Sequence, residues 1–240
     1  MFSPIRCEGS YSEMKISQLS PGIFEIASDE KRGLATVNLT PGRTVYGEQL
    51  TQLGDIEYRS WSPYRSKLSA AILKGIKNIP IAPGNRVLYL GVASGTTCSH
   101  VSDIVGADGH IWGIDFAPRP FRDFIDNLVR YRGNISPILA DAHRPELYSG
   151  LVPRVDVIYA DVAQADQSNI LAMNTEFFLR RDGWAMMAIK SRSIDVNQPP
   201  QRIYSEQTED LRGRGFDIVD LVELEPYEMD HAMVVARYGH

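Results

Sequence analysis

Four ionisable side chains that could take part in substrate binding or proton transfer lie far apart in the sequence, at Lys67, Asp161, Lys190 and His231. Asp161 and Lys190 each stand at the carboxyl end of a predicted strand, and His231 stands where the last strand begins. Such positions meet at one edge of an open α/β sheet, so we expect these three side chains to converge. Lys67 is predicted on a helix beside its apolar stripe, from which it could reach over the same edge. Taken singly, each residue also has an ordinary role, as a solvated lysine, a turn-capping aspartate or a structural histidine. Their convergence favours a functional site at this edge.

A glycine-containing loop at Gly91–Thr97 follows a predicted strand and opens a predicted helix. Glycines let a ligand approach the backbone, and a helix N-terminus presents free N–H groups. The spacing is not G-x-G-x-x-G, because Ala93 and Thr96 stand where a dinucleotide-binding loop needs glycine. An NAD-linked enzyme is therefore disfavoured, whereas S-adenosylmethionine, which has no phosphate, needs only the looser G-x-x-x-G. The candidate cofactor contacts in this loop are Gly91, Ala93, Ser94, Gly95, Thr96 and Thr97.

Acidic residues follow the next two predicted strands. Asp115 ends the strand after the loop, where a carboxylate can accept hydrogen bonds from both hydroxyls of a ribose. The pair Asp141-Ala142 follows the third strand and could receive the amino group of an adenine. Asp115 also reads as a turn residue, and a lone Asp-Ala pair is a weak signal. Together with the loop, they favour a nucleoside-containing cofactor over a simple strand-to-helix turn.

Strands and helices alternate from residue 86 onward, which predicts an α/β fold with a parallel sheet covered by helices on both faces. The last two strands are joined by too few residues for a crossover helix, so they must be antiparallel. This is the plan of a Rossmann-like methyltransferase sheet, mostly parallel with the last strand antiparallel. Predicted strands occupy 86–90, 110–115, 135–139, 155–159, 183–190, 216–225 and 232–238; predicted helices lie near 97–105, 121–128, 167–180 and 200–213.

The N-terminal part of the chain has a different pattern. Short runs of β type are separated by turn signals, such as Ser20-Pro21-Gly22 and Asp29 to Gly33. We predict a small antiparallel β subdomain at 1–57 and a methyltransferase domain at 58–240. A helix is expected to begin at Ser62-Pro63, because serine can cap a helix and proline fits its first position. Its apolar residues recur at helical spacing: Leu68, Ile72, Ile76 and Ile79.

Composition sets further limits. The 240 residues carry a net charge of −5, which argues against a protein that holds nucleic acid unaided. No apolar run is long enough to span a membrane, Met1 to Ser10 does not read as a secretory signal, and Cys7 and Cys98 make no disulfide framework or metal spacing. We therefore expect a cytoplasmic protein without a metal site. Local positive charge near the catalytic edge could come from Arg59, Arg65, Lys67, Arg119, Arg122, Lys190 and Arg192.

Several segments together resemble fibrillarin. They are Leu90–Thr97 with Ser99–Asp103, Asp156–Gln164, Glu225–Ala232 and Trp61–Ala70. The likeness covers essentially the whole chain, and one small departure is Val92, where the family often has alanine. Eukaryotic fibrillarins carry a Gly/Arg-rich N-terminal tail, which this sequence lacks, so it is similar to the archaeal form.

The resemblance implies an RNA 2′-O-methyltransferase that acts on rRNA and tRNA with S-adenosylmethionine. Lys67, Asp161, Lys190 and His231 would form its catalytic set, with Lys190 nearest the hydroxyl. The implied cofactor contacts are the 91–97 loop, Asp115, Phe116, Asp141, Ala142, Asp161 and Gln164. The resemblance also implies a box C/D ribonucleoprotein with a Nop-domain scaffold protein, a kink-turn-binding ribosomal-type protein, a guide RNA and a target RNA.

Two alternatives share much of this pattern. A small-molecule methyltransferase has the same fold and cofactor, but it normally carries a lid or pocket insertion, and no long apolar insertion is present. A non-catalytic structural subunit of a ribonucleoprotein could retain a vestigial cofactor site. The completeness of the loop, the acidic residues and the four ionisable side chains argues against this second alternative.

Overall fold

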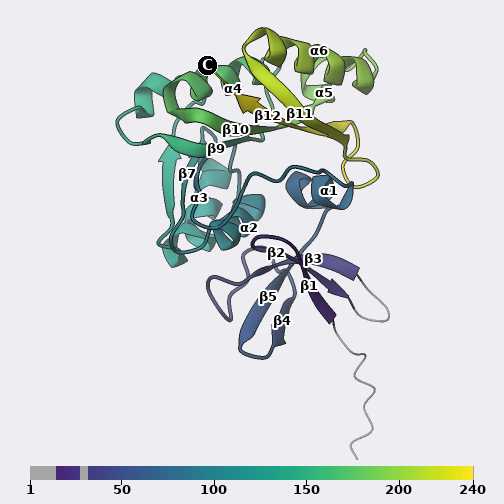
Figure 1. Ribbon diagram of the computed structural model, residues 1–240. Helices are drawn as coiled ribbons and strands as arrows, with labels where there is room; N and C mark the ends of the chain where they lie inside the picture. The colour runs from purple at the N-terminus through teal and green to yellow at the C-terminus, as the bar shows by residue number, and fades with distance from the viewer. Residues whose placement is uncertain (1–14, 28–31, 240) are drawn as a thin grey trace, which may run out of the picture.

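A computed structural model describes residues 15–27 and 32–239 and contains two sheets (Figure 1). Cys7 and most of the turn expected at Asp29 to Gly33 lie outside the described residues. Among the helices described, none is both long and apolar enough to cross a membrane.

The N-terminal sheet is antiparallel, as predicted, and forms a lobe below the larger α/β unit (Figure 1). Its strand order is β1-β2-β3-β5-β4. The strands are β1 (Lys15–Ser20), β2 (Ile23–Ala27), β3 (Arg32–Val37), β4 (Leu50–Leu53) and β5 (Ile56–Trp61). Because β5 crosses residue 57, this sheet extends past the boundary expected for the subdomain.

The second sheet has seven strands in the order β11-β12-β10-β9-β6-β7-β8. They are β6 (Arg86–Leu90), β7 (His110–Asp115), β8 (Ile135–Leu139), β9 (Val155–Ala160), β10 (Leu179–Lys190), β11 (Phe216–Glu223) and β12 (His231–Tyr238). β12 lies between β10 and β11 and is antiparallel to both, whereas β6 to β10 pair in parallel. The predicted α/β fold with an antiparallel last strand is confirmed.

The central strands are buried on both faces, because helices cover both sides of the sheet. Alternate residues of β6 enter two cores: Tyr89 packs in one, and Leu88 in the other. The first core receives α1 (Lys67–Leu73), α2 (Thr96–Val105) and α3 (Pro118–Asn127), and the second receives α4 (Gln167–Phe178) and α6 (Pro200–Gly213). Figure 1 shows α1 to α3 below the sheet and α4 to α6 above it. Two 3-10 helices, at Val129–Tyr131 and Pro145–Tyr148, and the short α5 (Ser191–Ile194) complete the described elements.

The prediction for the first helix was wrong at both ends. Ser62 starts a turn, in which its carbonyl accepts from Arg65 N at 3.3 Å, and α1 begins only at Lys67. The capping residue is Ser66, whose hydroxyl accepts from Ser69 N at 3.3 Å. The helix ends at Leu73, before Gly75 with its φ of +85°. Lys67 therefore occupies the first position of α1, close to the sheet edge.

A buried charge network joins the N-terminal sheet to α2. Arg59 of β5 is fully buried and pairs with Glu48 and with Asp103, the latter at 2.7 Å. Asp103 of α2 also pairs with Arg132 and accepts from the hydroxyl of Thr36 at 2.7 Å. Arg59 is thus not available as a surface cation near the catalytic edge, contrary to our expectation, whereas Arg65, Arg119, Arg122 and Arg192 are exposed.

Candidate functional site

All four predicted catalytic residues lie at one edge of the seven-stranded sheet. Asp161 directly follows β9, and Lys190 is the last residue of the parallel neighbour β10. β12 runs antiparallel to β10, so its first residue, His231, stands directly opposite Lys190 in register. Lys67 reaches this edge from the first turn of α1. The strand-end argument therefore predicted the common location of Asp161, Lys190 and His231 correctly, whereas the place of Lys67 depends on α1.

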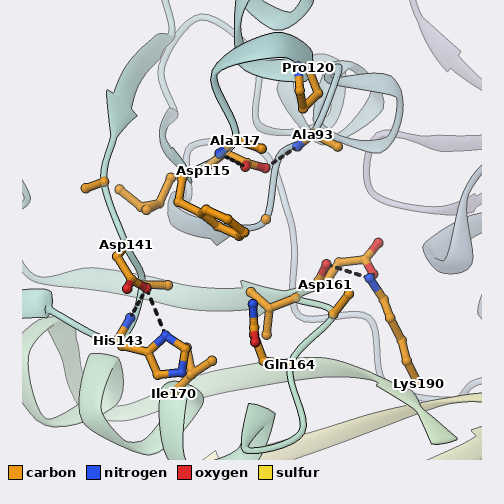
Figure 2. A pocket seen from close by; sticks show the side chains of 17 residues that line it. Ala93, Asp115, Ala117, Pro120, Asp141, His143, Asp161, Gln164, Ile170 and Lys190 are labelled. Carbon is orange, nitrogen blue, oxygen red and sulfur yellow. Dashed lines mark hydrogen bonds and ion pairs between the residues drawn. The ribbon is translucent and has the colours of Figure 1, made fainter. Parts of the chain in front are cut away.

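Asp161 is shared by the two lysines. Its Oδ1 lies 2.8 Å from Lys190 Nζ and 3.4 Å from Lys67 Nζ. Lys190 also donates to the backbone carbonyl of Asp161 at 2.9 Å (Figure 2). All three side chains are largely buried, with 13–16% of their surface exposed. Because burial reduces solvent screening, the carboxylate holds both ammonium groups more firmly than it would at the surface. We call the part of the sheet edge formed by Lys67, Asp161, Lys190 and His231 the charged rim.

His231 is held as a neutral acceptor on the same rim. Burial lowers the pKa of His231 below the ordinary value of 6.5, and the positive charges of Lys67 and Lys190 lower it further. Its Nδ1 lies 2.6 Å from the carbonyl oxygen of Met229, which can only accept, so the ring proton sits on Nδ1. The neutral tautomer leaves a lone pair on Nε2.

A cavity of about 230 Å³ opens beside these residues at the carboxyl ends of the strands (Figure 2). Asp161 and Lys190 form part of its wall. Eight of the residues predicted to contact the cofactor line it: Gly91, Ala93, Asp115, Phe116, Asp141, Ala142, Asp161 and Gln164. Phe116 is 62% exposed, so it is not the core aromatic that was its alternative interpretation.

Asp115 fixes the shape of the loop that borders the cavity. Its two oxygens accept from the backbone N–H groups of Ala93 at 2.8 Å and Ala117 at 2.9 Å (Figure 2). The first bond holds the loop after β6, and the second holds the start of α3. A carboxylate has about four lone-pair positions, so each oxygen keeps capacity to accept from a ligand.

Gly91 is needed at its position for two reasons. Its φ of +82° lies in the left-handed region, and a Cβ built on it would stand 2.7 Å from the carbonyl oxygen of Asp161. Gly95 has a φ of +91° and faces Phe124, again with 2.7 Å from a built Cβ to the ring. The first glycine packs against the backbone of Asp161, and the second packs against α3.

The second half of the predicted loop does not line the cavity. Ser94 is exposed, Gly95 packs on α3, and Thr96 begins α2. Thr97 is buried and its hydroxyl donates to Ser66 Oγ at 3.0 Å, which ties α2 to the cap of α1. These four residues shape the loop and its surroundings, and their direct cofactor contacts stay a prediction.

Sequence reasoning missed other residues of the cavity wall, among them Pro120, His143, Val162, Ala163 and Ile170. His143 is the one with chemistry of its own, since its ring lies between the carboxylates of Asp141 and Asp166. The spacing Asp141-x-His143 was the available signal. Among the residues that the structure describes, no group of three or more His, Cys, Asp or Glu side chains is arranged to hold a metal ion.

Comparisons with known proteins agree with this arrangement. The family model described as Fibrillarin matches residues 14–240. A fibrillarin-like rRNA/tRNA 2′-O-methyltransferase of Pyrococcus horikoshii is 51% identical over 218 residues, covering 90% of this chain and 95% of the relative. The crystal structure of Aeropyrum pernix fibrillarin with natively bound S-adenosyl-L-methionine has a TM-score of 0.86 and 47% identity, covering 94% of this chain and 99% of that one.

A third match is a fibrillarin whose crystal structure was solved in a complex with Nop5p. It has a TM-score of 0.79 and 42% identity, covering 87% of this chain and 94% of that one. A family model that spans nearly all of the sequence, together with relatives that share about half of its residues, leaves a single assignment: the chain belongs to the fibrillarin family.

Proposed function

We propose that this chain transfers a methyl group from S-adenosylmethionine to the 2′-hydroxyl of a ribose in rRNA or tRNA. The observation that carries the proposal is that Lys190 and Asp161 belong both to the cavity wall and to the charged rim. A methyl donor in the cavity and a hydroxyl on the rim would meet at these two residues. Alignment of this kind accounts for much of the catalysis needed for an already activated methyl group.

The cavity fits S-adenosylmethionine in its chemistry. Asp115 keeps acceptor capacity for ribose hydroxyls, and Asp141 offers a carboxylate where an adenine amino group is expected. Gly91 has no side chain, so a ligand can approach the backbone at a point where a Cβ would collide with Asp161. When bound, S-adenosylmethionine supplies a methyl group activated by a sulfonium.

Lys190 and His231 would act on the hydroxyl in different ways. The ammonium group of Lys190, which is paired with Asp161, can stabilise negative charge that develops on the ribose oxygen. His231 is neutral and keeps a free lone pair, so it is the group on this rim best prepared to take the proton. Lys67 would hold the Asp161 carboxylate from the other side.

We further propose that the reaction is directed by a guide RNA within a box C/D ribonucleoprotein. The net charge of −5 and the few exposed arginines near the rim leave the chain poorly equipped to hold RNA by itself. A Nop-domain scaffold, a kink-turn-binding protein and the guide RNA would deliver the target nucleotide. The solved complex of a similar fibrillarin with Nop5p supports this arrangement.

Reconstitution with these partners tests the proposal. Radiolabelled methyl transfer is expected on a target complementary to the guide, and not on a target with a 2′-deoxy nucleotide at the selected position. Lys190→Ala should abolish transfer while S-adenosylmethionine still binds, as measured by calorimetric titration. Transfer to free metabolites without RNA would indicate a small-molecule enzyme instead, and absence of cofactor binding in the assembled complex would indicate a structural subunit.

A further inference from the structure

One titratable residue in the cavity wall has no role in the proposed reaction. His143 follows β8, and its ring lies between two carboxylates. Nδ1 is 2.8 Å from Asp141 Oδ1, and Nε2 is 3.0 Å from Asp166 Oδ1. The backbone N–H of His143 also donates to Asp141 Oδ1 at 2.9 Å, so the residue contacts this carboxylate twice (Figure 2).

This geometry requires a charged imidazole. An ionised carboxylate has no proton to give, so both ring nitrogens must donate, and only the imidazolium has two N–H groups. The pKa values agree. Burial alone would lower the pKa of His143, but the hydrogen bonds and negative charges of Asp166 and Asp141 outweigh it and raise this pKa above 6.5. The pKa of Asp141 is lowered, first by the His143 backbone N–H and then by its ring.

The hydrogen bonds leave half of the Asp141 carboxylate available. Both bonds from His143 fall on Oδ1, so Oδ2 is not engaged by this histidine. Asp166 is the residue that precedes α4, and Ile170 of the same helix lines the cavity. A second link runs from Asn174 of α4, whose amide donates to the carbonyl of Ala142 at 2.8 Å. Two hydrogen bonds thus fix the 141–143 segment to α4, one from His143 to Asp166 and one from Asn174 to Ala142.

We propose that His143 is a positioning residue that holds Asp141 ready to accept the exocyclic amino group of the adenine. In doing so it selects adenine over a base with a carbonyl at that position. The inference rests on the proposed function, because it takes the cavity to be the S-adenosylmethionine site. A base with a carbonyl there would present an acceptor to a carboxylate held in its ionised form, and two acceptors cannot share a hydrogen bond.

The position of His143 makes adenine recognition depend on pH. The charged groups that act on its ring are Asp141, from its own segment, and Asp166, from α4. Arg144 acts on Asp141 and pairs with Glu146 at 2.9 Å. Because the pKa of His143 is raised, the imidazolium is complete below 6.5 and is lost as the pH rises through the higher folded value. Above that value the neutral ring keeps a single N–H and can no longer donate to both Asp141 and Asp166, so Asp141 is less firmly held and adenine affinity should decline.

The test uses two probes that lack the titrating amino-acid portion of the cofactor. 5′-Methylthioadenosine carries the adenine amino group, and 5′-methylthioinosine carries a carbonyl in its place. Calorimetric titration from about pH 6 to about pH 9 compares the wild-type chain with His143→Asn and His143→Arg. The control is His110→Asn, which changes a histidine that hydrogen-bonds Ser136 at 2.8 Å and does not line the cavity.

The wild type and the control should prefer the adenine probe by about tenfold or more at the lower pH, and this preference should shrink as the pH rises. His143→Asn should show little preference at any pH. His143→Arg should retain the preference without the pH dependence, because a guanidinium stays charged and has donors for both carboxylates. Circular dichroism and thermal unfolding establish that each variant is folded, and the arginine variant tests the charge even if the asparagine variant is unstable.

Two results would overturn the inference and separate it from the proposed function. If the wild type binds S-adenosylmethionine but the adenine preference is independent of pH and survives in His143→Asn, then only the role of His143 is wrong. If the wild type binds neither the probes nor S-adenosylmethionine at any pH, in isolation or with its partners, then the cavity is not the cofactor site and both proposals fail.

Discussion

Replacing Gly91 with alanine should damage the cofactor cavity and the catalytic edge together. The built Cβ lies 2.7 Å from the carbonyl oxygen of Asp161, and the same oxygen accepts from Lys190 Nζ at 2.9 Å. Relief of the overlap must therefore move either the loop or the backbone that supports Lys190. We expect Gly91→Ala to weaken cofactor binding and to reduce methyl transfer.

The magnitude follows from two contributions. A left-handed φ, here +82°, costs an alanine about 1–2 kcal/mol. A contact this short against backbone adds about 1–3 kcal/mol, as overpacking in a dense interior does. The sum, about 2–5 kcal/mol, would lower the melting temperature by roughly 4–20 °C for a chain of this size.

Gly84→Ala is a matched control, because it separates the cost of the left-handed φ from the cost of the short contact. Gly84 has a φ of +80°, but nothing lies within 4 Å of its built Cβ. It should therefore show the conformational cost, about 1–2 kcal/mol, without the overlap. Both variants also share the small gain that alanine brings by restricting the unfolded chain.

The assays are thermal unfolding, calorimetric titration with S-adenosylmethionine and methyl transfer in the reconstituted complex. Gly91→Ala should lose more stability than the control and should bind the cofactor at least about tenfold more weakly, whereas Gly84→Ala should bind it normally. Equal stability losses in the two variants, with unchanged cofactor binding in both, would refute the reasoning that Gly91 is needed for the approach of Asp161.

Three further predictions concern charged groups. Asp161→Asn leaves two ammonium groups without their shared carboxylate, so methyl transfer should fall by about 100-fold or more in single-turnover assays, with the cofactor still bound. Because the pKa of His231 is lowered, methyl transfer should stay constant above pH 6.5 and decline only at more acid pH. If His231→Gln shows the same decline, this histidine is not its source. Asp103→Asn removes the buried partner of Arg59 and a second arginine, which should cost about 3–5 kcal/mol in chemical denaturation. An unchanged midpoint would show that the network contributes nothing.

The convergence of three proposed catalytic residues could be predicted because it depends on strand direction alone. Parallel strands end at one edge and an antiparallel neighbour begins there, so Asp161, Lys190 and His231 were expected together without knowledge of any contact. Spacing could not decide whether Lys67 joins them. Its place depends on where α1 begins, and the capping residue is Ser66 rather than the expected Ser62.

Residues whose role depends on tertiary neighbours escaped prediction. Thr97 belongs to a typical cofactor loop, yet its hydroxyl faces Ser66 from another helix. Arg59 was expected to supply positive charge near the sheet edge, and only the fold reveals that it is buried and paired with Glu48 and Asp103. The charge of His143 likewise depends on a carboxylate 23 residues away in the chain. Local pattern carries no information about such partners.

Asp161 belongs to both the cavity and the charged rim, but it uses different atoms in each. Its contribution to cofactor binding and its contribution to holding Lys190 can therefore be tested separately. Its carboxylate pairs with the two lysines. Its carbonyl oxygen accepts a hydrogen bond from Lys190 and lies where a side chain at position 91 would otherwise stand. Asp161→Asn changes only the carboxylate, so it should impair transfer and spare the cofactor. Gly91→Ala displaces the backbone, so it should impair both. If instead both variants lose cofactor binding equally, the carboxylate itself would have to contact the methyl donor, and its primary task would be cofactor binding rather than holding Lys190.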